Sequence, residues 1–204
     1  MKIQHPNLAL SRQAARDGGI RPVWFFWIEA RDRDNGSAQP LGLWTGDEDI
    51  TVSVQTPAGG TSSRLYLGGC NLSVDGIQYV ADLTDNPITV SMSQIAAPVQ
   101  QLVRVRDVRL AYCELHSTTL IGGALTSPPD LDWVGIVDEA PVATPSVGSD
   151  GGIALSVRSE LMSMLTAINP AKSSDAHQKR RQPGDRFSEY ASIIHSRKVQ
   201  WFKG

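Results

Sequence analysis

The segment Val23-Trp24-Phe25-Phe26-Trp27-Ile28 is the longest apolar run in the chain. Its β-branched and aromatic residues are typical of a strand that is well buried. A polar stretch follows, and within it Asn35-Gly36 is a strong signal for a hairpin turn. The chain then returns through Leu41-Gly-Leu-Trp44. These features predict a first antiparallel β-hairpin, from which the rest of the fold can be worked out.

Short apolar alternations continue the same pattern on the C-terminal side of this hairpin. Asp75-Gly76 is a second hairpin signal, with residues 77–80 as the returning strand. Residues 99–114 mix two stretches that resemble strands. In all, the sequence predicts about ten short strands with regular turn signals. Besides those already described, the predicted strands include residues 50–54, 65–67, 88–92, 133–137 and 153–157.

Helical patterns lie mainly near the two ends of the chain. Residues 6–17 predict a short helix that Gly18-Gly19 ends. Residues 158–167 are compatible with a strand that runs into a short helix. After Pro183-Gly184, an apolar stripe predicts a helix over residues 185–196, and residues 199–202 predict a last strand.

These elements together predict a mainly β protein. We expect two small antiparallel β-barrel or sandwich domains and a short C-terminal helix. Gly122-Gly123 and Ser127-Pro128-Pro129 interrupt the strand pattern, so the boundary is predicted in residues 118–130. The predicted domains are therefore residues 1–120 and residues 131–204.

The composition excludes several classes of protein. The chain has 204 residues, of which 41% are hydrophobic. Its longest apolar run is far below the ~20 residues that a membrane span requires. The first twenty residues have no apolar segment of the signal-peptide type. We therefore expect the protein in the cytoplasm until something carries it elsewhere.

A net charge of −2 hides an asymmetry along the chain. Residues 172–204 contain eight Lys and Arg residues and three acidic residues. Residues 1–171 contain eleven Lys and Arg residues and eighteen acidic residues. A basic tail on an acidic body is compatible with nucleic-acid binding. It is equally compatible with a tail that docks on the acidic face of a neighbouring subunit.

No arrangement in the sequence predicts catalysis, a metal or a cofactor. The acidic cluster Asp47-Glu48-Asp49 follows a glycine and reads as a solvated turn. The four histidines at 5, 116, 177 and 195 have no metal-ligand spacing, and no GxSxG pattern is present. Cys70 and Cys113 are predicted as small buried apolar residues, with a disulfide left open. We therefore expect no enzyme activity.

The basic triplet Lys179-Arg180-Arg181 is predicted on a loop before the helix at 185–196. Three consecutive cations can bind phosphate. However, no aromatic residue lies between them and no base-stacking platform precedes them. Pairing with acidic side chains of the same or a neighbouring subunit is the favoured interpretation.

The surrounding pattern Ser174-Asp-Ala-x-Gln-x-x-Arg-x-Pro-Gly-Asp-x-Phe187, followed by a predicted helix and Trp201, resembles the tail-tip hub (baseplate hub) proteins of long-tailed phages and gene transfer agents. Leu43-Trp44-Thr45-Gly46 resembles the "LWTG" element of that family. The segment from Trp133 to Pro141 resembles the strand that opens its second half. The patches extend over the whole chain and occur in the family's order.

This resemblance implies a pair of small β domains related to tail-tube subunits, arranged as a ring around the tail channel. Such hubs join the tube to a central fibre or host-contact protein, and DNA meets them only in transit. The resemblance thus implies a structural homo-oligomer, a trimer or a hexamer, at the virion tail tip. The resemblance further implies that this homo-oligomer contacts the distal tail protein or tube subunits. The residues that it singles out as intersubunit or structural are Trp44, Lys179, Arg180, Arg181, Gly184, Asp185, Phe187 and Trp201. Some relatives bind an iron–sulfur cluster through cysteines, which the two cysteines here do not support.

Three alternatives stay open at this point. Within the same class, the chain could be the hexameric distal tail protein. From other classes, it could be a tail-associated cell-wall hydrolase or a nucleic-acid-binding β-barrel. The last of these predicts salt-sensitive binding that weakens when residues 179–181 are changed to Ala.

Overall fold

Strand β1, Arg21–Asp32, is paired on both sides in the larger of two sheets. On one side it pairs with β2, Ala38–Trp44, and on the other with β7, Arg106–Ile121. The predicted hairpin at Asn35-Gly36 is confirmed, and Gly36 there has a φ of 71°. The computed structural model describes residues 4–78, 85–142, 151–160, 174–191, 193–196 and 202.

The large sheet is antiparallel and has the strand order β2-β1-β7-β9-β10-β6-β5, with the short β8, Ala124–Leu125, on β7. The remaining strands in that order are β9, Asp130–Glu139, β10, Gly152–Ser159, β6, Ile88–Ser93, and β5, Ser73–Asp75. The second sheet is a hairpin of β3, Ile50–Gln55, and β4, Thr61–Tyr66. The mainly β prediction is confirmed, but neither sheet closes into a barrel within the described ranges.

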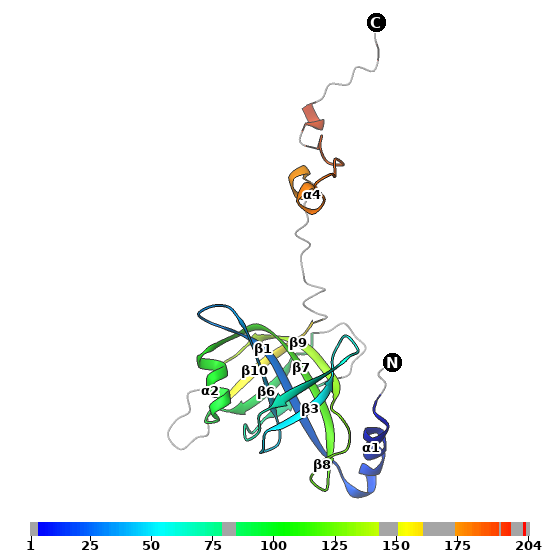
Figure 1. Cartoon of the computed structure of the whole chain (residues 1–204), viewed down its shortest axis with the longest axis vertical. Coiled ribbons are helices and arrows are strands. Elements are labelled where there is room, and N and C mark those ends of the chain that lie inside the picture. The colour runs from blue at the N-terminus through cyan, green and yellow to red at the C-terminus, as the bar shows by residue number, and fades with distance from the viewer. Residues whose placement is uncertain are drawn as a thin grey trace. The chain divides into compact units, whose positions relative to one another are not determined.

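Two hydrophobic cores lie on opposite faces of β1, because alternate side chains of a strand point to opposite sides. Phe26 and Ile28 belong to the larger core, which helix α2, Ala97–Arg104, also contacts through Val99 and Leu102. Phe25 belongs to the smaller core, which lies between β1 and the β3–β4 hairpin. Figure 1 shows β3 crossing β1 in the first unit of the chain.

Helix α1, Pro6–Gly18, confirms the predicted N-terminal helix. Its weak apolar stripe is sufficient because Leu8 is fully buried and the Ser11 hydroxyl lies 2.7 Å from that of Thr119 on β7. Gly19 ends the helix with a φ of 69°, a conformation that glycine adopts readily.

Two strand predictions are wrong. Residues 97–104 form α2, because Pro98 suits a first helical turn and the spacing of Val99 and Leu102 buries one helix face. Residues 77–78, after Asp75-Gly76, are not in a strand, and residues 79–80 lie outside the described residues. Strand β5 pairs instead with β6. By contrast, the predicted strands at residues 133–137 and 153–157 are confirmed as parts of β9 and β10, which pair with each other.

The chain divides into compact units at a different place from the predicted boundary. The units are Met1–Leu165 and Thr166–Gly204. Residues 118–130 lie inside the first unit, since β7 pairs with β8 and with β9 in this region. Gly122 and Gly123, with φ of 60° and 84°, form the tight turn that returns the chain rather than a linker.

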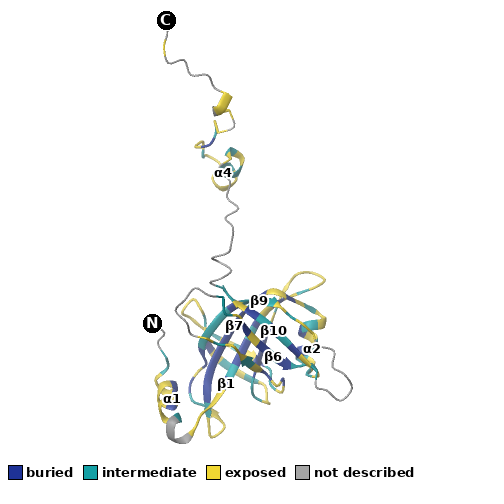
Figure 2. Ribbon diagram, turned by 180° about the vertical axis from the view of Figure 1, so that it is seen from behind, coloured by how far each residue is buried: buried dark blue, intermediate teal, exposed yellow. Residues whose placement is uncertain are grey.

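The second unit reverses the predicted order of loop and helix. Residues 175–181 form helix α4, Asp175–Arg181, whose first turn is capped by the Ser174 side chain. Turns and the 3-10 helix η1, Ile194–Ser196, occupy most of the predicted helix at 185–196. Pro183 follows α4 closely and cannot continue it. The predictions for residues 161–167 and 199–201 fall outside the described residues. Figure 2 shows buried residues concentrated on the strands of the first unit and few on the second.

Candidate functional site

Trp44, one of the residues that the sequence singled out, lies in the smaller core. Its ring stacks on that of Phe25, with centroids 5.3 Å apart and planes 12° from parallel. Its indole Nε1 donates a hydrogen bond to the Glu48 carbonyl at 2.6 Å. Only 8% of Trp44 is exposed, so it acts within the subunit and supports the turn that carries Asp47 and Glu48.

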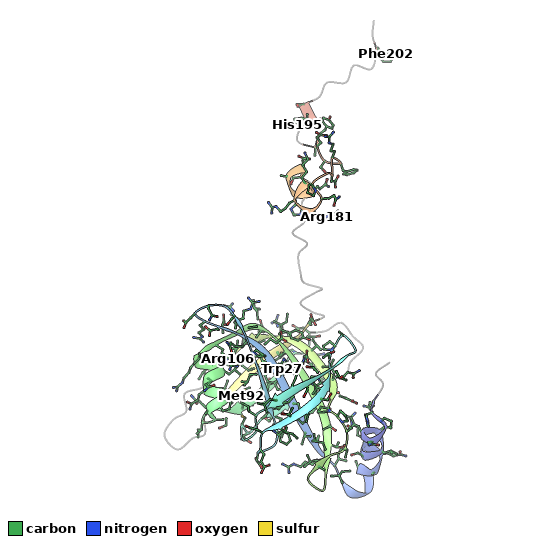
Figure 3. The ribbon with its side chains drawn as sticks, in the orientation of Figure 1. Trp27, Met92, Arg106, Arg181, His195 and Phe202 are labelled. Atoms are coloured by element: carbon green, nitrogen blue, oxygen red, sulfur yellow. The ribbon has the colours of Figure 1, made fainter. Side chains whose placement is uncertain are left out.

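The basic triplet of the second unit lies in the last turn of α4. Lys179 forms an ion pair with Asp175 one turn earlier, at 2.9 Å, and the hydrogen bond with Asp175 raises the pKa of Lys179. Arg180 and Arg181 are exposed. Cations at this end of a helix are stabilised by the helix dipole. The triplet is therefore held on a short helix, where Arg180 and Arg181 are exposed to solvent; Arg181 is labelled in Figure 3.

Apolar side chains follow the triplet and stand in solvent. The Asp185 carboxylate accepts a hydrogen bond from the Phe187 amide at 2.9 Å, which shapes the turn after the exposed Gly184. Phe187 is 90% exposed, and Tyr190 and Ile193 are more than half exposed. We call Phe187, Tyr190 and Ile193 the exposed apolar row. Trp201 lies outside the described residues, but its neighbour Phe202 is 89% exposed.

A buried ionic cluster that the sequence analysis did not predict lies between β7 and the β3–β4 hairpin. The Arg64 guanidinium on β4 lies 2.5 Å from Glu114 on β7, and only 10% and 4% of these side chains are exposed. The guanidinium also lies 4.5 Å above the ring of Trp27, which is labelled in Figure 3. Although burial opposes it, the hydrogen bond with Glu114 raises the pKa of Arg64. The Tyr112 hydroxyl donates to the same carboxylate at 3.2 Å.

His116 lies in the same cluster, two residues further along β7. Its side chain is fully buried, and its Nε2 is 2.9 Å from the Gln55 carbonyl at the end of β3. Burial lowers the pKa of the imidazole, although the hydrogen bond with Gln55 and the charge of Glu114 raise it. The imidazole Nδ1 and the Trp27 indole nitrogen have no hydrogen-bond partner among the described residues.

A signal for this cluster was present in the sequence but was weak. Glu114 and His116 alternate with the apolar Cys113 and Leu115, so one face of the strand is polar. Such a face usually meets solvent. Here the β3–β4 hairpin covers it, and Arg64 is fifty positions away from Glu114 in the sequence. The cover is a tertiary feature that alternation alone does not reveal.

The chemistry of the cluster is that of a structural network. The Glu114 carboxylate is occupied by Arg64 and Tyr112, and the thiol of neighbouring Cys113 is buried with its pKa raised. Cys70 and Cys113 are both free thiols and both buried, as predicted. Within the described ranges, no group of three or more His, Cys, Asp or Glu side chains is placed to hold a metal ion.

The acidic triplet at residues 47–49 is exposed, as predicted for a solvated turn. It lines a surface pocket of about 390 Å³, whose other lining residues include the apolar Val23, Trp44 and Leu120. The Asp49 carboxylate accepts a hydrogen bond from the Gly68 amide at 3.0 Å. Part of the triplet therefore stabilises the segment that leads from β4 to β5.

Comparison of the sequence with protein-family models and with curated proteins gave no match. Among the described helices, none is both long and apolar enough to cross a membrane.

Proposed function

We propose that this chain is a structural hub or adaptor protein of a phage tail tip, forming a ring of three or six copies that joins the tail tube to a central fibre or host-contact protein. The observation that carries the proposal is the exposed apolar row that follows the basic triplet in the sequence. This combination suits a segment that docks on another protein. The proposal also rests on the resemblance of residues 174–187 to hub proteins.

The exposed apolar row favours association because free energy is gained when apolar side chains are removed from water. Burying a side chain such as Phe or Ile contributes about 1.5–3 kcal/mol. Phe187, Tyr190 and Ile193 lie within seven residues and are all exposed in the isolated chain. A partner surface that covers them gains this energy, whereas the isolated subunit does not.

Charge supports a protein partner with an acidic face. Arg180 and Arg181 are exposed and precede the exposed apolar row in the sequence. Lys179 keeps its charge through the ion pair with Asp175. The first 171 residues of each copy carry an excess of seven acidic residues, so another copy is one source of such a face. Apolar side chains distinguish this surface from a purely electrostatic nucleic-acid site.

The first unit suits the tube-facing part of such a ring. Its sheets are antiparallel, and ring formation is a common way to cover the free edges of sheets. In this proposal the first unit is the tail-tube-like domain. The second unit carries the contact with a neighbour or with the central fibre.

The test is cryo-electron microscopy of the tail ends of intact virions, with this chain traced in the density. We expect a ring of three or six copies at the end of the tube. Absence of the chain from purified particles would overturn the proposal. The number of copies distinguishes a trimeric hub from a hexameric distal tail ring.

A pair of matched variants tests the docking segment itself. Phe187→Ser changes a side chain of the exposed apolar row, and Ile95→Ser changes a residue of the first unit that is 83% exposed. We expect both variants to fold, but only Phe187→Ser to lose incorporation into particles. Equal incorporation of the two would show that the row is not an interface.

A further inference from the structure

The β3–β4 hairpin is attached to the large sheet mainly through side chains. Its two strands pair only with each other among the described strands, and an isolated bridge joins Leu67, just after β4, to Leu43 on β2. The attachment consists of the smaller core and the ionic cluster. Segments with few backbone bonds to their neighbours open at lower free energy than the sheet that they cover.

His116 provides the contact at the turn end of this hairpin. A carbonyl oxygen only accepts hydrogen bonds, so His116 Nε2 must carry the proton that it shares with Gln55. In the neutral imidazole, Nδ1 is then unprotonated. Since Nδ1 has no partner among the described residues, a second proton there would enter a buried place without an acceptor.

The charged groups around His116 come from each element packed against it. Glu114 on β7 lies 3.7 Å from Nε2, and the charge of Arg64 acts on the imidazole from β4. Asp132 contributes a negative charge from β9. Glu114 is held by Arg64 and Tyr112, and Asp132 accepts a hydrogen bond from Ser117. Both carboxylates therefore already have partners before an imidazolium forms.

We propose that the β3–β4 hairpin is an acid-responsive flap, which stays closed while His116 is neutral and opens when His116 takes up a proton. The closed hairpin keeps the imidazole dry, and an open hairpin gives the second ring nitrogen water as a partner. Protonation therefore favours the open form by linkage. This inference is independent of the tail-tip function, because it rests on the first unit alone.

The opening also uncovers a surface that the closed form hides. Trp27 and Glu114 lie beneath the hairpin and contact Arg64 on β4. Phe25 packs against Tyr66 of β4 in the same region, with ring centroids 5.1 Å apart. An open flap exposes these aromatic and charged groups together. The acid response is thus a local event with a defined structural consequence.

Amide hydrogen exchange of the full chain tests the proposal, with rates corrected for the intrinsic effect of pH. We expect protection of amides in residues 50–66 to fall about tenfold between pH 7.5 and 5.5, which corresponds to one pKa unit of linkage. Amides of β6 and β10 serve as the internal control and should keep their protection. If the hairpin amides keep theirs too, the flap does not exist.

Two variants assign the response to one side chain. His116→Gln retains a donor for the Gln55 carbonyl but does not titrate, so hairpin protection should no longer depend on pH. His177→Gln, in the second unit, should leave the response as in the wild type. An unchanged response in His116→Gln would overturn the assignment.

A spectroscopic measurement on the wild type keeps the proposal testable even if His116→Gln does not fold. Nuclear magnetic resonance of the imidazole nitrogens should show a neutral ring with the proton on Nε2 at pH 7.5. The charged ring should appear only together with faster exchange in residues 50–66. An imidazole that becomes charged while the hairpin amides stay protected would contradict the flap.

Discussion

The Arg64 guanidinium and the Glu114 carboxylate join the two sheets of the first unit, with Nη1 and Oε2 2.5 Å apart. The two strands that carry them, β4 and β7, are not paired through their backbones. Burying two charges costs several kcal/mol, which close contact and further hydrogen bonds offset. Trp27 beneath the guanidinium and Tyr112 beside the carboxylate supply those additional contacts. The pair therefore specifies where the hairpin rests on the sheet.

Breaking this pair from one side should destabilise the protein strongly. Glu114→Gln leaves the Arg64 charge buried without its counter-charge, and we expect a loss of about 3 kcal/mol in the free energy of unfolding. The double variant Arg64→Met/Glu114→Leu should recover most of this loss, because no charge is then buried. Urea denaturation followed by tryptophan fluorescence measures both.

An exposed ion pair provides the control for that experiment. Arg158 lies 2.9 Å from Asp138, and about half of its side chain is exposed. We expect Arg158→Gln to cost less than about 1 kcal/mol. Equal costs for Glu114→Gln and Arg158→Gln would mean that the buried pair is not a specific attachment.

Tyr66 should make the free energy of unfolding depend on pH in the alkaline range. Burial raises its pKa to about 12, whereas an unfolded tyrosine ionises near 10. The folded chain therefore binds the phenolic proton more tightly, so the stabilisation is complete below pH 10 and is lost as pH rises from 10 towards 12. Burial also raises the pKa of Tyr112. Since Tyr112 is present in both proteins, the stability lost through Tyr66 is the difference in the free energy of unfolding between the wild type and Tyr66→Phe. This difference is measured by denaturation at each pH. If the two curves run parallel above pH 10, the prediction fails.

Local patterns in the sequence were sufficient for the first hairpin. Asn35-Gly36 sets the turn, and alternate residues of 23–28 fill two different cores. The same holds for α1 and for the strands β9 and β10. In each case the signal and the contact lie close together in the sequence.

Other elements could not be predicted, either because two local signals conflicted or because the contact joins distant segments. The spacing of Val99 and Leu102 is typical of a helix, but apolar β-branched residues in the same stretch favoured a strand. Residues 118–130 looked like a linker because glycine and proline also occur in tight turns between paired strands. The ionic cluster could not be predicted, because the sequence pattern does not show which strands cover β7.

The start of α4 had a local signal that was not used. Ser174 and Asp175 are typical of the start of a helix, but the basic triplet favoured a loop.

Leu110 has a backbone conformation that should make glycine preferable. Its φ is 57°, and it lies in an irregular part of β7 where residues 108–111 have no partner on β1. The left-handed region costs a residue with a side chain about 1–2 kcal/mol. Since Leu110 is 70% exposed, little packing is lost on truncation. We expect Leu110→Gly to be more stable than Leu110→Ala by about 1 kcal/mol in thermal or urea denaturation. A more stable alanine variant would contradict the strained backbone.

Cys70 and Cys113 should be unreactive in the native protein. Both side chains are almost fully buried, and burial raises the pKa of each thiol, so the reactive thiolate is scarce. We expect a thiol reagent such as dithionitrobenzoate to label neither residue under native conditions and both in urea without a reductant. Cys70→Ser should then leave one reactive thiol in urea. Absence of thiols in urea before reduction would show a disulfide instead.

Gly42 on β2 should not tolerate a side chain. A Cβ at this position would lie 2.4 Å from the Leu65 carbonyl oxygen and 2.8 Å from the Tyr66 ring, so β4 could not keep its place beside β2. Overpacking of this kind costs about 1–3 kcal/mol, and here the closest atom belongs to the backbone.

Gly60, before β4, is the matched control because a Cβ there meets only the Thr56 hydroxyl, at 3.4 Å. We expect Gly42→Ala to lower the free energy of unfolding by at least about 2 kcal/mol and Gly60→Ala to change it by less than about 0.5 kcal/mol. The Gly42→Ala variant should also lose protection of the Leu67 amide, which donates to the Gly42 carbonyl at 2.9 Å. Comparable stability of the two variants would mean that β4 does not approach β2 this closely, and the position of the hairpin on the large sheet would have to be revised.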